Sequence, residues 1–293
     1  MRCATKWQAE FLCLMTLVGG AGCSAPSAVE LIEKDNPALE KLATLGTPTL
    51  SAVQIVNRAQ ANGQLREASD NLPVFSFIRK VATTKPSDKN ATTNQKTKTY
   101  RAYTNNRDQT LIKVNGVKPT AKEIEEDRKE SLKRQRRFLE RNDKKGSDKV
   151  ISNNMDMYRE KFIPRLIGTE LVGNRPAYLI QLVPDTNHRL KNTTADRIMN
   201  QMLVKLWVDQ AEFQVSRMEA KTVEPIKLAA GVIGSINSIH VRLKQKRLTP
   251  EIWTDLKVEA DFDVRIIIAN FTFKMTSQSS GFELATVKKE KKP

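Results

Sequence analysis

Apolar and polar residues alternate with a period of two through much of the second half of the chain. The longest run is Asp255–Arg265 (DLKVEADFDVR), in which every second residue is apolar and the others are charged. Successive side chains of a β-strand point to opposite faces, so this segment predicts a strand with one apolar and one charged face. At about 3.4 Å per residue it would span roughly 37 Å, which is typical of large, twisted antiparallel sheets.

Other segments show the same alternation and predict neighbours for this strand. We expect roughly nine to eleven antiparallel strands. Thr83–Lys98 is polar and predicts a loop. Lys227–Ile236 is apolar with two glycines, which fits either a short buried helix or a flexible gate. The predicted strands include Val74–Ala82, Lys98–Thr104, Gln109–Val114, Phe162–Val172, Pro176–Val183 and Phe213–Val223.

Two segments carry the signals of helices. The first is predicted to begin after Thr49 or Ser51 and to end near Asn71, because its apolar residues recur at helical spacing. The second begins with a capping box, in which Thr120 and Glu123 bond each other's backbone N–H groups, and is expected to continue to about residue 142.

The second helix is nearly all charged. Its apolar stripe would consist of Ile124, Leu132, Phe138 and Leu139, so most of its circumference is expected to be solvated. The basic run Lys133–Arg141 would suit a membrane surface or an anionic ligand. We favour a solvated face held by pairs of opposite charge one turn apart, which is the usual state of charge-rich helices.

Together these elements predict an α+β fold with one large curved antiparallel sheet, an incomplete β-barrel wrapped around or covered by helices. No repeat or linker interrupts the pattern, so residues 48–285 are expected to form a single open-barrel domain with a charged helical insertion at about 117–148. Residues 23–47 are predicted to be a tether, and residues 286–293 a basic disordered tail.

The amino terminus has the pattern of a secretory signal over residues 1–22. Basic residues precede a short apolar core, and small residues follow it. The ending Gly20-Ala21-Gly22-Cys23 is similar to a bacterial lipobox, which predicts lipid attachment at Cys23. Ordinary cleavage near Ser27 or Ala28, or a retained anchor, are the alternatives. All three cysteines fall between Cys3 and Cys23, so we expect the mature domain to contain no disulfide.

The overall composition is that of a globular protein, with 39% hydrophobic and 28% charged residues among 293. The formal net charge of +16 makes polyanions the natural class of partner. Anionic lipid headgroups and lipopolysaccharide are such partners, whereas an exported protein is not expected to bind nucleic acid.

The sequence offers no pattern typical of catalysis. It has two histidines, His188 and His240, which are far apart, whereas zinc sites need three or four ligands. Nucleophile elbows and glycine-rich phosphate loops are absent. The carboxylates of Asp255, Glu259 and Asp261 alternate with apolar residues, which predicts a solvated sheet face. We therefore expect no enzyme, no metal and no cofactor.

The apolar face of the sheet is the remaining candidate for function. Helices could cover it completely and form a plain core, or leave a groove that holds acyl chains. The residue types fit both alternatives. The side chains predicted to line such a cavity are Tyr178, Ile180, Leu182, Leu206, Val241, Leu243, Leu256, Val258, Phe262, Val264, Phe271 and Phe273.

Two short motifs resemble a known family. Leu206-Trp207-Val208-Asp209, followed by Phe213–Glu219, is similar to a strand pair of the outer-membrane lipoprotein-sorting superfamily, and Pro250–Trp253 resembles its later tryptophan-bearing turn. This LolA-like superfamily contains the periplasmic lipoprotein carriers and related lipid-binding lipoproteins. The resemblance covers roughly residues 50–283 and implies an open barrel around helices, an apolar cavity for acyl chains, and no catalytic residues.

The leading hypothesis is an exported, non-enzymatic protein of the bacterial periplasm, anchored as a lipoprotein and monomeric, that binds lipid acyl chains or lipoproteins. The alternative from another class is a structural or signalling module of the envelope that binds an anionic partner through its basic surface. A hydrolase of anionic lipid is a third hypothesis, supported only by scattered carboxylates.

Overall fold

We describe a computed structural model of the chain, in which residues 50–69, 72–85, 94–105, 109–143, 161–185, 194–228, 234–266 and 269–285 are placed. The predicted signal over residues 1–22, the attachment site Cys23, most of the tether and the tail over residues 286–293 lie outside the described residues. Among the described residues, no helix has the length and hydropathy needed to cross a membrane.

Within the described ranges, three helices accompany the sheet: α3 (Ala52–Ala68), α4 (Ala121–Asp143) and α6 (Thr194–Asn200). Ser51 caps α3, since its side chain accepts from the Gln54 N–H while the Gln54 side chain accepts from the Ser51 N–H. The predicted capping box of α4 is present as well. The Thr120 N–H donates to Glu123 Oε2 at 2.9 Å, and the Glu123 N–H donates to Thr120 Oγ1 at 3.3 Å.

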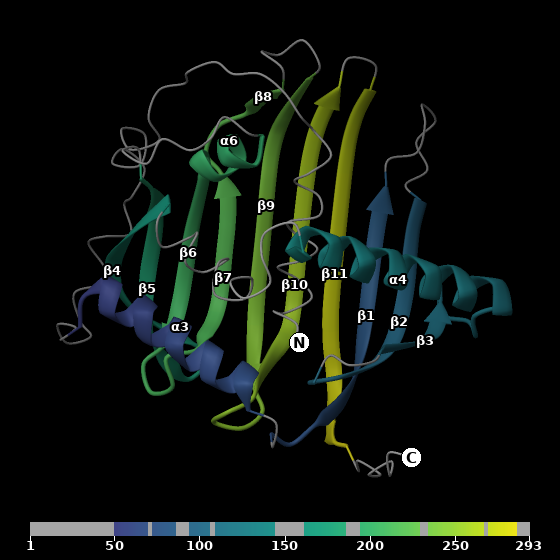
Figure 1. Ribbon diagram of the computed structural model, residues 1–293, viewed down its shortest axis with the longest axis horizontal. Helices are drawn as coiled ribbons and strands as arrows, with labels where there is room; N and C mark the ends of the chain where they lie inside the picture. Colours follow the sequence, from purple (N-terminus) through teal and green to yellow (C-terminus); the bar gives the residue numbers. More distant parts are fainter. Residues whose placement is uncertain are drawn as a thin grey trace.

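The strands form one antiparallel sheet of 11 members in the order β3-β2-β1-β11-β10-β9-β7-β6-β5-β4, with β8 pairing β9 beside this path. The sheet is open, because β3 and β4 are its two edges, and the predicted α+β open-barrel architecture is confirmed (Figure 1). The strands are β1 (Phe75–Lys85), β2 (Asn94–Tyr103), β3 (Gln109–Val114), β4 (Phe162–Val172), β5 (Arg175–Pro184), β6 (Met202–Asp209), β7 (Val215–Thr222), β8 (Ile226–Leu228), β9 (Gly234–Arg247), β10 (Trp253–Ile266) and β11 (Ala269–Leu284).

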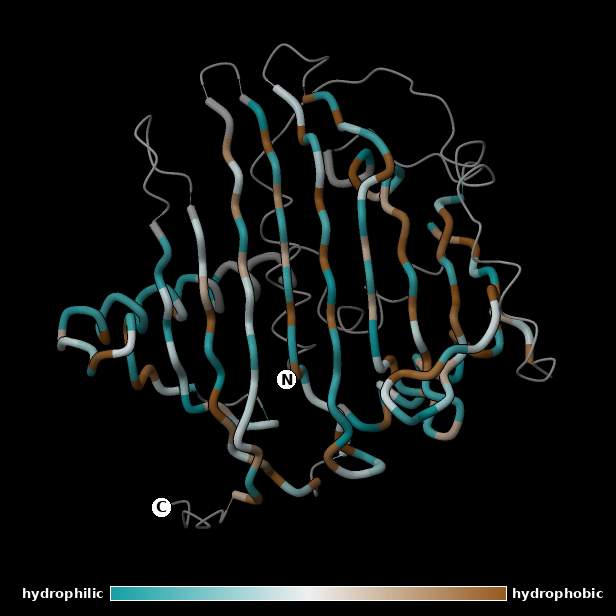
Figure 2. The backbone as a smooth tube through the Cα atoms, turned by 180° about the vertical axis from the view of Figure 1, so that it is seen from behind, coloured by the Kyte–Doolittle hydropathy of each residue, from teal (hydrophilic) through white to brown (hydrophobic). Residues whose placement is uncertain are grey.

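The helices α3 and α4 lie across the same side of the sheet, which we call the helix face; the opposite side is the outer face (Figure 1). Seen from the outer face, hydrophilic and hydrophobic residues alternate along the long strands (Figure 2). Because directly paired residues share a face, the register shows which side chains lie together. On β9 and β10, Val241 pairs with Ala260 on the helix face and Arg242 pairs with Glu259 on the outer face.

The structure corrects two local predictions from the sequence and narrows a third. Thr83–Lys98 is not a loop throughout, since β1 continues to Lys85 and β2 begins at Asn94. The described ends of Lys227–Ile236 form β8 and the start of β9, which pair with each other, so these ends are strands and not helix, whereas the flexible gate stays a prediction. Asp255 does not lie on the outer face: a bulge before Lys257 shifts the alternation, and Asp255 pairs with Gln245, which shares the helix face with Leu243.

Candidate functional site

The predicted cavity residues lie together on the helix face. One row of paired residues runs from β5 to β10 through Ile180, Leu206, Met218, Leu243 and Val258. A second row runs through Leu182, Val204, Ala220, Val241, Ala260 and Met275. Tyr178 lies beside Val208 on the same face, and Phe262 and Val264 pair with Phe273 and Phe271 of β11. Leu256 is the exception, because it occupies the bulge and has no direct partner on β9.

These side chains differ in how far they are covered. Ile180, Val241 and Val258 are fully buried, and Phe262 retains only 8% of its exposure. Tyr178, Leu182, Leu206, Leu243, Leu256, Val264 and Phe273 are half-buried. Phe271 is 46% exposed, although its partner residue belongs to the same apolar face. The apolar surface therefore extends beyond its cover, toward the β10–β11 end.

Two helices cover part of this face through apolar contacts. In α3, Ala52 and Ile55 are buried against Ile180 and Val208, with Leu206 and Tyr178 packed around them. In α6, Ile198 and Met199 join the largest apolar cluster. The other buried members of that cluster are Phe162, Met202, Ala220, Ile226, Leu228, Ile236, Ile239, Val241, Ala260 and Phe262.

The helix face carries more polar side chains on the other side of β11 than on β5 to β10. The row that contains Val258 continues through Ser277, Val81 and Lys98 before it reaches Val114. The next row passes through Ser279 to Arg79 and Tyr100. Serine and cationic side chains thus interrupt these rows, beside a small apolar cluster formed by Tyr100, Leu111, Val114 and Val81.

Helix α4 covers this polar half through Asp127, which is buried at 6% exposure. Its Oδ1 accepts from the Tyr100 hydroxyl at 2.8 Å and from Lys98 Nζ at 2.7 Å. Burial alone would lower the pKa of Lys98, but the hydrogen bond and negative charge of Asp127 outweigh it and raise that pKa. This ion pair fixes the amino-terminal part of α4 on the sheet.

The described residues of the apolar stripe predicted for α4 do not form the contact between α4 and the sheet. Ile124 and Leu132 are 48% and 52% exposed, respectively, and Phe138 and Leu139 have side chains outside the described residues. The pairs of opposite charge expected on the solvated side are present, since Glu125 lies within 3.6 Å of Arg128 and 3.8 Å of Lys129. Helix α4 therefore presents exposed apolar residues within a charged surface.

The two motifs that resemble the lipoprotein-sorting superfamily meet at one end of the sheet. Asp209 is 1% exposed, accepts two hydrogen bonds from Arg175 at 2.6 and 2.8 Å, and accepts the N–H groups of Ala211 and Glu212. Burial would raise the pKa of Asp209, but these hydrogen bonds outweigh it and lower the pKa. Sequence reasoning did not assign Asp209 this role, although its place directly after a buried strand marks it.

Glu212 connects the first motif to the second. Its Oε2 accepts the Trp253 indole N–H at 2.7 Å, and its Oε1 accepts Arg247 Nε at 2.6 Å. The turn after β6 is thereby bonded to the start of β10. Asp209 of the first motif and Trp253 of the second therefore both make hydrogen bonds that join strands at this end of the sheet. Trp207 lies on the outer face, where its indole N–H donates to Glu170 at 2.6 Å.

A chain of polar side chains crosses the helix face near the carboxyl end of α3. Arg66 donates to Gln214, the Gln214 amide donates to Gln245 at 3.1 Å, and the Gln245 amide donates to Asp255 at 3.1 Å. Burial raises the pKa of Asp255, and the nearby charge of Arg79 only partly offsets this effect. This chain forms a polar border to the apolar rows.

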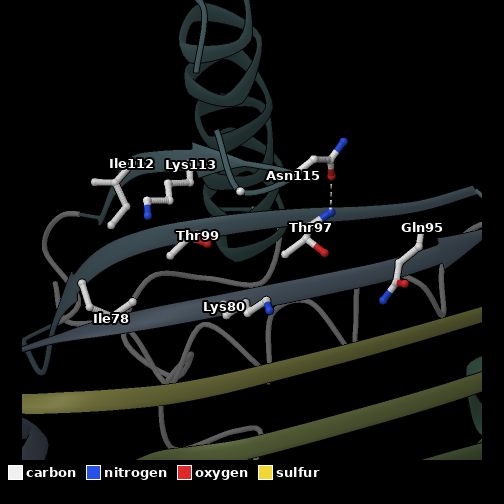
Figure 3. Close-up of a pocket in the computed structure, with 9 residues that line it drawn as sticks. Ile78, Lys80, Gln95, Thr97, Thr99, Ile112, Lys113 and Asn115 are labelled. Atoms are coloured by element: carbon white, nitrogen blue, oxygen red, sulfur yellow. Dashed lines mark hydrogen bonds between the residues drawn. The ribbon is translucent and has the colours of Figure 1, made fainter. Parts of the chain in front are cut away.

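A hollow of about 780 Å³ lies on β1–β3. Its lining comes from the side of the strands that carries Lys80 and Thr99, opposite to Lys98 (Figure 3). None of the predicted cavity residues contributes to it, so it is not the expected acyl cavity, and whether that cavity exists stays a prediction. The lining residues are Ile78, Lys80, Gln95, Thr97, Thr99, Ile112, Lys113, Asn115 and Gly116.

The described residues contain no group of three or more His, Cys, Asp or Glu side chains placed to hold a metal ion. His240 lies on the outer face, where its Nε2 is 2.9 Å from Glu219 Oε1. The outer-face carboxylates are paired with cations, as Glu259 is with Lys257 at 2.8 Å and with Arg242 at 3.5 Å. This arrangement is typical of a solvated sheet surface.

Comparison with known proteins gives matches among solved structures only: no family model and no curated protein matches the chain. A LolA superfamily protein from Nitrosomonas europaea matches at 11% identity with a TM-score of 0.28, over 82% of this chain and 96% of that one. A DUF1329 family protein from Desulfovibrio piger matches at 10% identity and a TM-score of 0.34, over 81% and 95%.

A candidate outer membrane lipoprotein-sorting protein domain from Vibrio parahaemolyticus matches at 11% identity and a TM-score of 0.31, over 80% of this chain and 95% of that one. Two of the three structures bear the name of the superfamily that the motifs resemble. At such low identities and TM-scores, the likeness adds nothing about a ligand, so a functional proposal has to rest on this chain's own side chains.

Proposed function

We propose that the protein is an exported, non-enzymatic component of the bacterial envelope that binds lipid or lipoprotein acyl chains on the helix face. The observation that carries this proposal is the apolar part of the helix face, which runs from β5 to β10 and continues on β11 through Met275, Phe273 and Phe271, while its cover by α3 and α6 ends earlier. Phe271, at 46% exposure, marks the uncovered end. Acyl chains are flexible and apolar, so a broad apolar surface with a polar border suits them.

Several features support the absence of chemistry in this proposal. The carboxylates of the outer face are paired with cations, Asp209 and Asp127 serve as structural acceptors, and neither of the two histidines lies beside a candidate nucleophile in the sequence. Attachment through Cys23 would hold the protein at a membrane as a monomer. Its net charge of +16 would favour anionic headgroups there over neutral ones.

The test is acyl binding by a pair of variants at adjacent positions of β11. Phe271→Asp places a charge on the exposed end of the apolar rows, whereas Thr272→Asp places the same charge on the outer face, where Thr272 pairs with Asp263. We expect Phe271→Asp to weaken binding of a fluorescent fatty-acyl probe by about tenfold or more. The bound acyl chain would bury the new carboxylate without a partner, which costs free energy. Thr272→Asp should leave it unchanged.

Native mass spectrometry of the protein purified from a bacterial envelope provides the complementary readout. A co-purifying phospholipid or acylated peptide would identify the class of cargo. If the protein carries no lipid and takes up no acyl probe, the helix face is a closed core and the proposal is wrong.

A second candidate function is supported by α4. The exposed Ile124 and Leu132, together with the basic run Lys133–Arg141, suit contact with an anionic partner in the envelope. This contact would be lost steeply with added salt, whereas acyl binding on the helix face would not. Co-sedimentation with vesicles containing phosphatidylglycerol, at low and high salt, separates the two functions. Leu132→Glu should abolish only the α4 contact.

A further inference from the structure

Three buried polar atoms at the α6 end of the apolar rows have no hydrogen-bond partner in the part of the chain that the structure describes. Arg197 of α6 donates from Nη1 to the Lys227 carbonyl oxygen at 3.3 Å, but its Nε and Nη2 are buried without an acceptor. Gln201, one helical turn later, has an equally buried Oε1 without a donor. Buried polar atoms in native proteins are nearly always bonded, so three in one turn require an explanation.

The residues around these unpaired atoms are apolar, so the atoms destabilise the folded protein when no ligand is bound. Ile198 and Met199, the next two residues of α6, belong to the main apolar cluster together with Met202 and Leu228. No carboxylate in the part of the chain that the structure describes pairs with Arg197. Two guanidinium nitrogens that are shielded from water and bonded to no acceptor destabilise the folded state. An anionic ligand would remove that cost.

The geometry of the unpaired atoms limits the ligand. Nε and Nη2 form one edge of the guanidinium, which donates two parallel hydrogen bonds to the oxygens of a phosphate or carboxylate. The Oε1 of Gln201 needs a donor close to that anion. A phospholipid headgroup supplies both, since its phosphate accepts and its glycerol hydroxyl or ethanolamine ammonium donates. A fatty-acid carboxylate supplies only the acceptor.

We propose that Arg197 and Gln201 form the headgroup site for a phospholipid whose acyl chain lies on the adjacent apolar rows. This inference rests on the proposed acyl-binding function and adds the polar end of its ligand. Arg197 binds the phosphate, and Gln201 accepts from the headgroup donor. Ile198 and Met199 then separate the headgroup from the chain, so the ligand is held with its phosphate at α6.

The experiment compares two lipids with the same acyl chain, lysophosphatidylglycerol and monoacylglycerol, by calorimetric titration of the full-length protein below their micellar concentrations. The wild type should bind lysophosphatidylglycerol at least about tenfold more tightly, because the phosphate gains charge-assisted hydrogen bonds. Arg197→Met should remove this preference and leave monoacylglycerol binding unchanged. Gln201→Leu should reduce the preference by a smaller factor.

Arg128→Met is the matched control, since it removes an equal charge from an exposed position on α4 and should keep the full preference. Glycerol phosphate without an acyl chain tests for a free-anion site, and tighter binding of it than of the lysolipid would overturn the proposal. Arg197→Met should unfold at the same or a higher temperature than the ligand-free wild type, because it removes an unpaired buried charge.

The outcomes separate this proposal from the function on which it rests. If neither lipid binds the wild type, the acyl-binding function itself is wrong. If both lipids bind equally well, or if Arg197→Met keeps the preference for the phosphate, the acyl function stands and the headgroup site at Arg197 and Gln201 is wrong.

Discussion

On β5 to β10 the helix face meets α3 and α6 through apolar side chains, whereas on β1 to β3 it meets α4 through an ion pair. The same rows of paired residues cross both regions, yet Ile180 and Val258 stand in one region where Lys98 stands in the other. Apolar packing is non-directional and tolerates exchange of one apolar partner for another. An ion pair on a polar surface fixes one helix in one place.

Because of this difference, we expect the two regions of the sheet to have different roles. The proposed function requires the region under α3 and α6 to exchange part of its cover for a ligand, which apolar packing allows because an acyl chain offers the same kind of contact as a leucine. The region under α4 cannot make this exchange, since no acyl chain replaces the bonds from Lys98 and Tyr100 to Asp127. We therefore expect ligand binding to affect the first region and to leave the second unchanged.

The largest effect is expected from the buried anchor at the end of the apolar region. Asp209→Ala leaves Arg175 without its bidentate partner and should lower the free energy of unfolding by about 3 kcal/mol, as for other broken buried pairs. Urea unfolding followed by circular dichroism measures it. Asp261→Ala, which removes an outer-face carboxylate 3.7 Å from Arg242, should cost less than about 1 kcal/mol. Equal costs would show that Asp209 is not an anchor.

The next effect compares one row on either side of β11. Ile180→Ala removes a fully buried side chain beneath α3 and should cost about 2–4 kcal/mol. Val81→Ala removes a half-buried side chain of the polar region and should cost about 1 kcal/mol or less. The same urea titration applies. If Val81→Ala lowers the free energy of unfolding as much as Ile180→Ala does, the two regions are packed equally tightly, which would contradict the proposed difference between them.

A smaller effect is expected from the ion pair beneath α4. Asp127→Ala removes the acceptor of Lys98 and Tyr100 and should cost about 1–3 kcal/mol, with faster amide hydrogen exchange in α4 but not in α3. Glu126→Ala, at the neighbouring exposed position of α4, is the control and should change neither quantity.

The ion pair also predicts a dependence on alkaline pH. Because the folded-state pKa of Lys98 is raised, the stability from this pair is fully present below the unfolded-state pKa of about 10.4. It is lost as the pH rises through the folded-state pKa. Wild-type protein should lose stability in this window, and Asp127→Ala should lose less. Identical alkaline slopes would contradict the role of Lys98.

The smallest effect is expected from Asp255 on the polar border. A raised folded-state pKa means that the folded protein binds this proton more tightly than the unfolded chain, so ionised Asp255 destabilises the fold at neutral pH. Asp255→Asn should raise the free energy of unfolding at pH 7, and the gain should disappear as the pH falls through the folded-state pKa. Asp209 contributes in the opposite direction, since its pKa is lowered and its stabilisation is lost on acidification.

The alternation of the sequence was enough to predict the sheet and the face to which most side chains belong. The period of two is a property of each strand alone, so Val241, Val258 and Phe262 could be assigned to one face before any contact was known. The caps at Ser51 and Thr120 were equally local. Local patterns could not reveal the bulge that moves Asp255 to the helix face, because a bulge depends on the paired strand.

The sequence by itself therefore determined the strands, the helices and the apolar character of one sheet face, because these follow from residues close together in the chain. Tertiary structure decided what covers that face. It placed Asp127, and not Ile124 or Leu132, against the sheet, and it buried Nε and Nη2 of Arg197 and Oε1 of Gln201 without hydrogen-bond partners among the described residues. Such contacts join strands and helices distant in sequence, and their free energy depends on burial and charge pairing, which appear only when the chain is folded.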